Sequence, residues 1–504
     1  MGVFRHPDAH PDAETEPGLT SGDTEKSHGR NPKKQKKEPE LPRYNSEGQQ
    51  INHNGHAVTR FVAPDGESGR SWFHPWHFLR ICWRSTSTAS QFTNVLWPFT
   101  IATVVLHFAY GDRQLWIFIT AYLGMLPCAN LVGFAGQELA RKMPKVAGII
   151  LETTFGSIVE IILFMVLITR PTDNTGVIRA AILGSILANL LFCLGMCFFV
   201  GGIFHPQQTF HEAISEVGSN LMLVAAVGLI IPTVFYNSLA NGRLTREDAA
   251  ASSLKISRAA AIILLVAFCV YLWFQCSSHH GLYEDILEED EERDHDRHQD
   301  LKKDKLTFTE SIVAVVIGLT FVSFSAVFLV QQIEFMVVER HVSDAFLGLI
   351  LIPLVEKVSE HLTAIDEAYD NQMNFALSHV IGASIQTALL NTPLVVIVGW
   401  GLGKNHMDLN FELFDAVVII LAIVVVGNFL RDEKSDYLEG ALCVFVYILI
   451  AVSAWYYPDP VHEGGTSSAS EAASGGNETT TTSSMAQEAM VQAATTAARM
   501  AFNI

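Results

Sequence analysis

The chain alternates long apolar runs with short polar connections from about residue 94 onward. Each run is long enough to cross a hydrocarbon core of ~30 Å as an α-helix. Eleven runs lie near residues 94–110, 114–136, 146–169, 177–202, 220–240, 258–276, 308–333, 343–369, 373–403, 414–430 and 437–457. Two of them, 343–369 and 373–403, are longer than one crossing needs, so we expect a tilt or a broken helix there. The pattern predicts an all-α polytopic membrane protein with about 11 transmembrane helices.

The predicted helices divide into one extra helix and two groups of five. Because five crossings are an odd number, the second group starts from the opposite side of the membrane. The sequence therefore predicts two inverted five-helix repeats, an arrangement typical of alternating-access transporters. The first transmembrane half is expected at 91–276 and the second at 308–457, with an acidic cytosolic loop at 277–307 between them.

Polar segments flank the predicted helices. Residues 1–90 are rich in Pro, Gly, Asp, His and Lys, and they predict a disordered cytosolic N-terminal tail. Residues 458–504, rich in Ser, Thr, Ala and Gly, predict a second disordered tail. With eleven crossings the two tails lie on opposite sides of the membrane.

Composition narrows the functional class. The chain is 49% hydrophobic and only 17% charged, with a mean hydropathy of +0.27, so the lipid bilayer is an expected partner. Much of the net charge of −19 lies in the acidic loop, and no nucleic-acid partner is expected. Neither a phosphate-binding loop nor a zinc or disulfide pattern is found among its residues, so we expect no cofactor and no enzyme. Homo-oligomer formation stays open.

Two predicted helices each carry a glutamate where lipid disfavours it. Glu160 lies within 146–169 and Glu360 within 343–369. A carboxylate at the bilayer centre costs at least ~2.5 kcal/mol and marks an ion or proton path. Each glutamate is followed by a helix that carries glycine and serine, at Gly184-Ser185 and at 382–384. Two such carboxylates in corresponding places predict a transport site at the interface between the repeats.

The candidate cation- and proton-binding residues surround these two glutamates. They are Glu160, Gly156, Ser157, Ser185 and Asn189 in the first half and Glu360, Ser359, His361, Ser384 and Gln386 in the second. Gly156 shares a helical face with Glu160 and leaves room for another helix. Hydroxyl and amide oxygens can replace the hydration shell of a hard cation such as calcium. His361 can share protons or simply pack.

Protons and cations compete for a buried carboxylate. A low-dielectric surrounding favours its neutral, protonated form, and a bound cation favours the charged form. Glu160 and Glu360 are therefore expected to bind the transported cation and protons alternately. Glu356, Lys357 and Arg179 are possible modulators, and Glu152 and Glu367 are expected at the membrane interface.

Around these residues the chain resembles the cation/proton exchanger family, the vacuolar calcium/proton antiporters of the cation/calcium exchanger superfamily. The similar stretches are 126–127 with 137–140, and 382–386 with 392–394 and 399–400. The resemblance covers about residues 90–457 and identifies the chain as a divergent member. It implies an eleven-span fold and cation/proton exchange at an organellar membrane, with Glu160 and Glu360 as the central glutamates. It also implies that the acidic segment, here 284–304, acts on cytosolic access to the site.

The chain departs from the family pattern next to both glutamates. The family has Gly-Asn in two places where this chain has Gly156-Ser157 and Glu356-Lys357, and it has glutamine where Arg179 stands. A lysine near the site repels a divalent ion more than a monovalent one. The expected function is Ca²⁺/H⁺ exchange into a vacuole or another acidic organelle, with Na⁺ or K⁺ in place of Ca²⁺ as the alternative. A non-transporting regulatory relative and an intramembrane enzyme are further, weaker alternatives.

Overall fold

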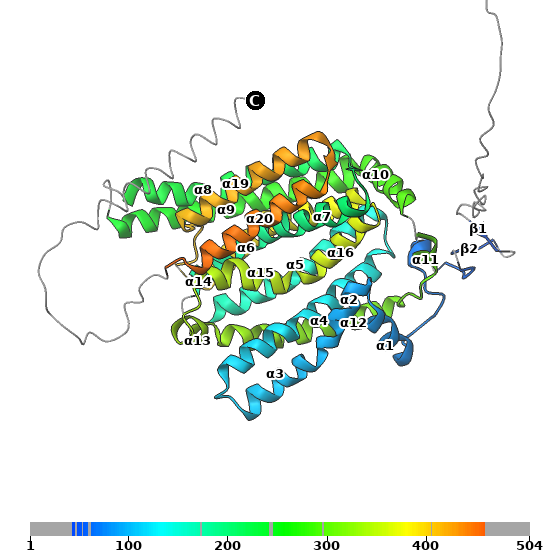
Figure 1. Ribbon diagram of the computed structural model, residues 1–504, viewed down its shortest axis with the longest axis horizontal. Coiled ribbons are helices and arrows are strands. Elements are labelled where there is room, and N and C mark those ends of the chain that lie inside the picture. Colours follow the sequence, from blue (N-terminus) through cyan, green and yellow to red (C-terminus); the bar gives the residue numbers. More distant parts are fainter. Residues whose placement is uncertain are drawn as a thin grey trace, which may run out of the picture. The chain divides into compact units, whose positions relative to one another are not determined.

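The computed structural model describes residues 43–45, 48–52, 54–58, 62–171, 174–240, 245–294, 297–404 and 406–458. Within them, ten helices are long and apolar enough to cross a membrane. These ten coincide with ten of the eleven predicted runs. The eleventh run, 343–369, is a helix in several pieces, as its length led us to expect. The helical fold (Figure 1) confirms the predicted class.

The first half begins with the extra helix and continues through five spans. The extra helix is α3 (Trp97–Ala109). The next spans are α4 (Gln114–Ala140), α5 (Lys145–Thr169), the span α6 (Thr175–Leu187)–η3 (Ala188–Cys193)–α7 (Leu194–Phe204), α8 (Glu212–Ala240), and α9 (Arg246–Trp273) with η4 (Phe274–Ser278).

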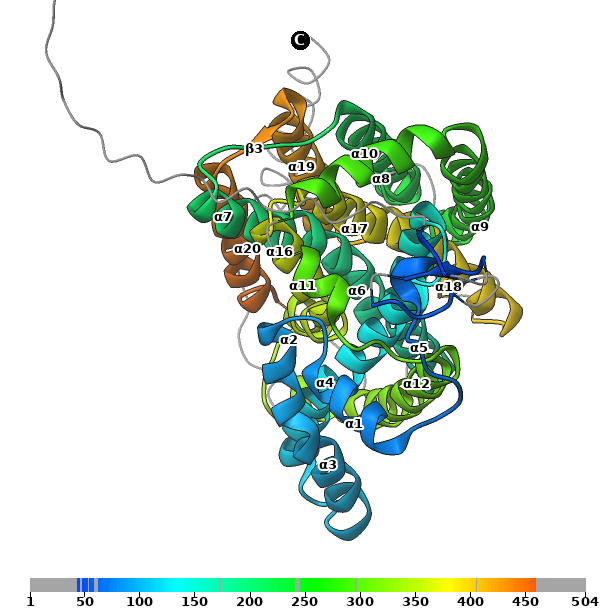
Figure 2. The same ribbon diagram turned by 90° about the vertical axis from the view of Figure 1, so that its right-hand side faces the viewer.

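The second half repeats this plan. Its first span is α12 (Phe308–Gln331) with α13 (Ile333–Val338), and its second is the broken helix α14 (Asp344–Phe346)–η5 (Leu347–Leu351)–α15 (Ile352–Glu356)–α16 (Val358–Tyr369). The third span is α17 (Met373–Gln386)–η6 (Thr387–Asn391)–α18 (Thr392–Gly401). The last two spans are α19 (Leu413–Phe429) with η7 (Leu430–Asp432), and α20 (Tyr437–Trp455). Helix α4 packs along α12, and α7 along α20 (Figures 1 and 2). The two halves therefore share one core.

Prolines account for two irregular turns in the second half. Pro353 and Pro393 each follow a short π-helical turn, η5 and η6. Proline has no N–H and its ring clashes with the carbonyl four residues earlier, so a widened turn before it relieves the clash. The chain breaks again at Lys357, whose backbone angles of −94° and 0° end α15 and start α16. The break places Glu360 in the first turn of α16, where the helix dipole favours negative charge.

The polar segment before the first span contains more structure than its sequence indicated. Within 1–90, the strands β1 (Arg43–Tyr44) and β2 (Gln50–Ile51), the turn η1 (Pro64–Gly66), and the helices α1 (Pro75–Arg84) and α2 (Thr88–Thr93) are formed; a 3₁₀ turn η2 (Asn94–Leu96) joins α2 to α3. The expectation of a disordered tail is therefore wrong for 75–90. Short polar anchors explain the order: Lys142 Nζ, for example, donates to the backbone carbonyls of Gly66 and Leu306, each at 2.8 Å. The predicted tail 458–504 lies outside the described residues, apart from its first residue.

The acidic segment is helical and docks on the membrane region. It forms α10 (His280–Arg293) and α11 (Arg297–Lys302). The carboxylate of Asp290 accepts backbone N–H groups of Asn374 and Phe375 at the start of α17, at 2.8 and 3.2 Å. Burial outweighs these contacts and raises the pKa of Asp290 from 3.8 to about 6. Two short strands, β3 (Gln208–Thr209) and β4 (Lys434–Ser435), form an antiparallel pair that contacts α10, because Arg293 Nη1 donates to the Thr209 carbonyl at 3.2 Å.

Candidate functional site

The two predicted glutamates meet at the break in the second half. Glu160 comes from the middle of α5, and Glu360 from the first turn of α16. The ammonium of Lys357 lies between them, with Nζ 2.9 Å from Glu160 Oε2 and 3.3 Å from Glu360 Oε2. The side chains of Glu160 and Lys357 are completely buried, and that of Glu360 is 15% exposed. An ion pair thus joins the two repeats at the predicted position.

The opposite half supplies neutral donors to Glu160. Thr387 Oγ1 and Asn391 Nδ2 donate to Glu160 Oε2 at 2.9 and 3.0 Å. Both residues lie in the π-helical turn η6. Residues four apart lie on one face of a helix, so both side chains can reach the same carboxylate oxygen. This explains how η6 contributes two partners to one carboxylate oxygen.

The first half offers a similar contact beside Glu360. Asn189, in the π-helical turn η3, lies with Oδ1 3.1 Å from Nε2 of His361. His361 also packs against the Phe192 ring, with centroids 5.8 Å apart. Each half therefore reaches across to the other half's glutamate region from a π-helical turn that follows a glycine- and serine-bearing helix.

Small residues let the two glutamate helices approach each other. A Cβ atom at Gly156 would overlap the carboxylate of Glu360, so any larger residue there would displace that carboxylate. Next to it, Ser157 Oγ donates to Gln386 Oε1 at 2.9 Å. Ser359 packs in the same way against Gly133 on α4. The sequence-predicted role of Gly156, room for a neighbouring helix, agrees with this geometry.

Several buried polar atoms of this region have no hydrogen-bond partner among the described residues. They are Glu160 Oε1, Ser185 Oγ, Asn189 Nδ2, both carboxylate oxygens of Glu356, and Asn391 Oδ1. Buried polar groups are normally paired, and exceptions gather where a ligand binds. Most of these atoms are oxygens, the ligands that hard cations prefer. Hence the arrangement is suited to a small cation.

Two predicted residues lie apart from the central cluster or bond elsewhere. Ser384 Oγ donates to the carbonyl of Val380 on its own helix, at 2.9 Å. The guanidinium of Arg179 pairs with Asp408, in the connection between α18 and α19, at 2.5 Å. Arg179 is therefore paired with Asp408, away from Glu160 and Glu360.

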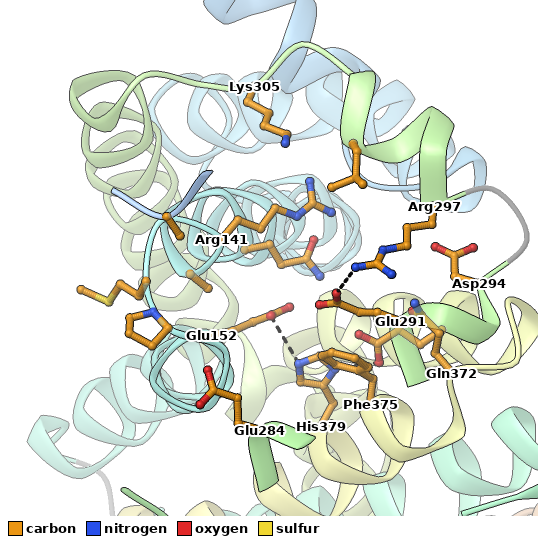
Figure 3. Close-up of a pocket in the computed structure, with 18 residues that line it drawn as sticks. Arg141, Glu152, Glu284, Glu291, Asp294, Arg297, Lys305, Gln372, Phe375 and His379 are labelled. Carbon is orange, nitrogen blue, oxygen red and sulfur yellow. Dashed lines mark hydrogen bonds and ion pairs between the residues drawn. The ribbon is translucent and has the colours of Figure 1, made fainter. Parts of the chain in front are cut away.

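A cavity of about 390 Å³ lies beyond the N-terminal end of α5 (Figure 3). Its wall includes Glu152 and Glu367, which flank His379: Nε2 is 3.3 Å from Glu152 Oε2 and Nδ1 is 2.7 Å from Glu367 Oε2. The acidic helices contribute Glu291 and Arg297, paired at 3.1 Å, to the same wall. The sequence placed Glu152 and Glu367 at the membrane interface, and it did not indicate that they meet at His379.

The cavity is aligned with the central glutamates. Glu152, Gly156 and Glu160 follow one another at four-residue spacing and share one face of α5. Eight residues of α-helix rise by about 12 Å. The cavity therefore lies roughly that far along α5 from the central ion pair, on the side where the acidic helices dock.

The sequence pattern of the family described as "Sodium/calcium exchanger protein" matches residues 113–277 and 310–456, more than half of the chain. The chain belongs to the sodium/calcium exchanger family. Both halves of this family member are matched, and the gap between the two matches corresponds to the acidic helices. The predicted relationship is thereby confirmed.

Relatives with assigned names agree with this membership. The chain is 32% identical to vacuolar cation/proton exchanger 2 of Oryza sativa subsp. japonica over 369 residues, 73% of this chain and 82% of the relative. It is 31% identical to the vacuolar calcium ion transporter of Schizosaccharomyces pombe over 375 residues, 74% of this chain and 87% of the relative. A crystal structure of the Ca²⁺/H⁺ antiporter protein YfkE has a TM-score of 0.57 at 23% identity, covering 72% of this chain and 99% of that one. The last likeness confirms the fold.

Three functional candidates escaped the sequence analysis. Thr387 and Asn391 lie four residues apart inside an apolar span, and this polar pair on one helical face was the available signal. His379 is likewise a histidine within an apolar run. Nothing in the sequence indicated that η6 contacts Glu160, because that contact joins residues more than 220 positions apart.

Proposed function

We propose that this protein is a secondary active cation/proton antiporter that moves Ca²⁺ into a vacuole or another acidic organelle in exchange for H⁺. Membership of the sodium/calcium exchanger family supports transport, and the names of the similar relatives support calcium, protons and the vacuolar membrane. The observation that carries the proposal is the junction of Glu160 and Glu360, one carboxylate from each repeat, around a single buried cationic group.

In this mechanism Glu160 and Glu360 hold either a cation or protons. When the cation binds, oxygens that lack partners complete its shell, among them Glu160 Oε1 and Asn391 Oδ1. When protons bind, the carboxyl groups become neutral and are cheaper to carry through a closed, low-dielectric state. A site whose carboxylates are charged and empty, or that holds a cation and protons together, does not pass easily through the closed state. Cation flux and proton flux are therefore coupled.

The proton gradient supplies the free energy. Each pH unit across the membrane is worth ~1.36 kcal/mol per proton. Two or three protons that move down a gradient of about two units can therefore lift one divalent ion by several kcal/mol. Rocking of one repeat against the other would expose the shared site to each side in turn.

A monovalent cation is the second candidate cargo. Lys357 brings a fixed positive charge into contact with both glutamates, and a positive charge repels a divalent ion twice as strongly as a monovalent one. If Lys357 stayed in place during transport, Na⁺ or K⁺ would fit the remaining charge better than Ca²⁺.

Ion uptake into vesicles tests the proposal. Purified full-length protein is reconstituted into acid-loaded liposomes, and Ca²⁺, Na⁺ and K⁺ are offered separately while the internal pH is followed. We expect Ca²⁺ uptake that collapses the pH gradient, and we expect Glu160→Gln and Glu360→Gln each to abolish it. Glu334→Gln, an exposed glutamate on α13, is the matched control and should transport normally. Robust exchange by either central variant would overturn the two-carboxylate mechanism.

A further inference from the structure

Lys357 occupies the position that a transported cation needs. Its ammonium contacts Glu160 and Glu360 at 2.9 and 3.3 Å, and its side chain is completely buried. A calcium ion bound to the same two carboxylates would lie 2.3–2.6 Å from their oxygens. The ammonium and the ion cannot share that space, and their charges repel. Ca²⁺ binding to both glutamates therefore requires Lys357 to move.

A second partner for Lys357 lies next to it in the chain. Glu356 is only 2% exposed, and neither of its carboxylate oxygens has a hydrogen-bond partner among the described residues. A buried, charged carboxylate without a partner is costly, so Glu356 needs either a proton or a nearby cation to neutralise it. Lys357, the next residue in the chain, carries a completely buried ammonium that could serve as this cation.

The local backbone is suited to such a movement. Lys357 is the residue at which α15 ends and α16 begins, and its ψ of 0° departs from the helical value, although its N–H still donates to the Pro353 carbonyl and its own carbonyl accepts from the His361 N–H, each at 3.0 Å. A lysine carries its charge on a flexible four-carbon chain. A change of side-chain rotamers at this position can redirect the ammonium without disturbing a helix interior.

We infer that Lys357 is a tethered counter-ion that pairs with Glu160 and Glu360 when the site lacks a cation and transfers to Glu356 when a cation binds. This inference rests on the proposed function, because it assigns a step within the same exchange. After the transfer, Glu356 and Lys357 neutralise each other, and two carboxylates face the incoming ion. Two negative charges match one divalent cation. Transfer of Lys357 to Glu356 thus makes a lysine at the site compatible with calcium as the transported ion.

The double-mutant cycle of Glu356 and Lys357 tests this transfer. The half-saturating Ca²⁺ concentration of full-length protein is measured in liposomes for wild type, Lys357→Met, Glu356→Gln and the double variant. If the Lys357 ammonium occupies the site in about nine molecules of ten, it weakens the apparent Ca²⁺ affinity about tenfold. We therefore expect Lys357→Met to lower the half-saturating concentration about tenfold. Glu356→Gln, which removes the alternative partner, should raise it by a similar factor.

The double variant distinguishes a transfer from a fixed ion pair. If Lys357 moves to Glu356, loss of the lysine makes Glu356 irrelevant, and the double variant behaves like Lys357→Met. If the residues form only a static charge balance, the effects of the two single variants add, so the double variant lies between them, near wild type. That second pattern would overturn the inference. Lys404→Met is the matched control, because Lys404 donates to the backbone carbonyl of Arg170 at 2.9 Å, away from the glutamates.

Two further outcomes keep the inference separate from the proposed function. Wild type that exchanges Na⁺ or K⁺ but not Ca²⁺ would overturn the transfer, since Lys357 would then remain in place. Wild type that exchanges no cation would overturn the proposed function, and the inference would fall with it. Lys357→Gln provides a second charge-removing variant if Lys357→Met does not reach the membrane, and thermal unfolding in detergent checks the fold of every variant.

Discussion

The Glu160–Lys357 pair of the central cluster and the Glu291–Arg297 pair of the cavity wall each join a carboxylate to a basic side chain, but the two pairs differ in burial and in origin. In the cluster, Glu160 and Lys357 are completely buried and come from opposite repeats. In the cavity, Glu291 and Arg297 are partly exposed and come from neighbouring acidic helices. Charges shielded by water interact weakly, whereas buried ones must be neutralised. We propose that the first pair belongs to the ion-binding site and that the second lies where the ion approaches that site.

Removal of one carboxylate from each region should give the largest contrast. Breaking a buried ion pair costs about 3–5 kcal/mol, so Glu160→Gln should reduce exchange by more than a hundredfold. An exposed pair is worth at most about 1 kcal/mol, so Glu291→Gln should change the rate by no more than about fivefold. Initial rates of Ca²⁺ uptake in liposomes measure both. Equal losses in the two variants would erase the distinction between binding and approach.

Crowding the central crossing should have the next largest effect. A Cβ at Gly156 overlaps Glu360, whereas a Cβ at Gly176, at the start of α6, meets no atom within 4 Å. Overpacking typically costs about 1–3 kcal/mol, so Gly156→Ala should slow Ca²⁺ uptake at least about fivefold. Gly176→Ala is the control and should transport like wild type. Normal uptake by Gly156→Ala would mean that the helices need not approach this closely.

The amide of Asn391 gives a smaller, more specific test of the cluster. Its Nδ2 donates to Glu160 at 3.0 Å and its Oδ1 lacks a partner among the described residues. Hydrogen bonds to charged groups contribute about 1.5–3 kcal/mol, so Asn391→Ala should raise the half-saturating Ca²⁺ concentration about tenfold or more. Asn428→Ala, at an exposed position of α19, should leave it unchanged. An unchanged value for Asn391→Ala would remove η6 from the site.

The smallest predicted effect concerns the docking of α10 beside the cavity. Because the folded pKa of Asp290, about 6, is above its ordinary value of 3.8, its contribution to docking is complete below pH 3.8 and is lost as the pH rises through 6. Amide hydrogen exchange in α10, corrected for the intrinsic rates, should be slower at pH 5 than at pH 7. Asp290→Asn should reduce this difference. Faster corrected exchange at pH 5 would reverse the sign of the prediction.

The sequence predicted the helices far better than the contacts between them. Apolar length alone located the spans, because a bilayer imposes the same length on every crossing. Glu160 and Glu360 were recognisable because carboxylates are rare in such runs. The bridge through Lys357 was not, since the sequence does not reveal that the chain breaks at this residue and directs its side chain toward Glu160. The contacts of Thr387 and Asn391 with Glu160 could not be predicted either, because they depend on packing between the repeats.

The two polar segments teach a related lesson. Composition predicted disorder for 1–90, yet α1 forms, and His74 at its start donates its backbone N–H to Glu310 at 2.8 Å. Similarly, the acidic segment folds into α10 because Asp290 finds donors at the start of α17. Propensity describes a segment in water, and it fails where a neighbouring surface provides partners.

The most direct test of the account follows both ions in one vesicle. Liposomes with equal pH on both sides and Ca²⁺ only inside are diluted into Ca²⁺-free buffer, and Ca²⁺ efflux and internal pH are recorded together. We expect Ca²⁺ to leave as protons enter, so that the interior acidifies. We expect Glu160→Gln to stop both fluxes. Efflux of Ca²⁺ without acidification, at a clamped membrane potential, would contradict a site shared by cation and proton.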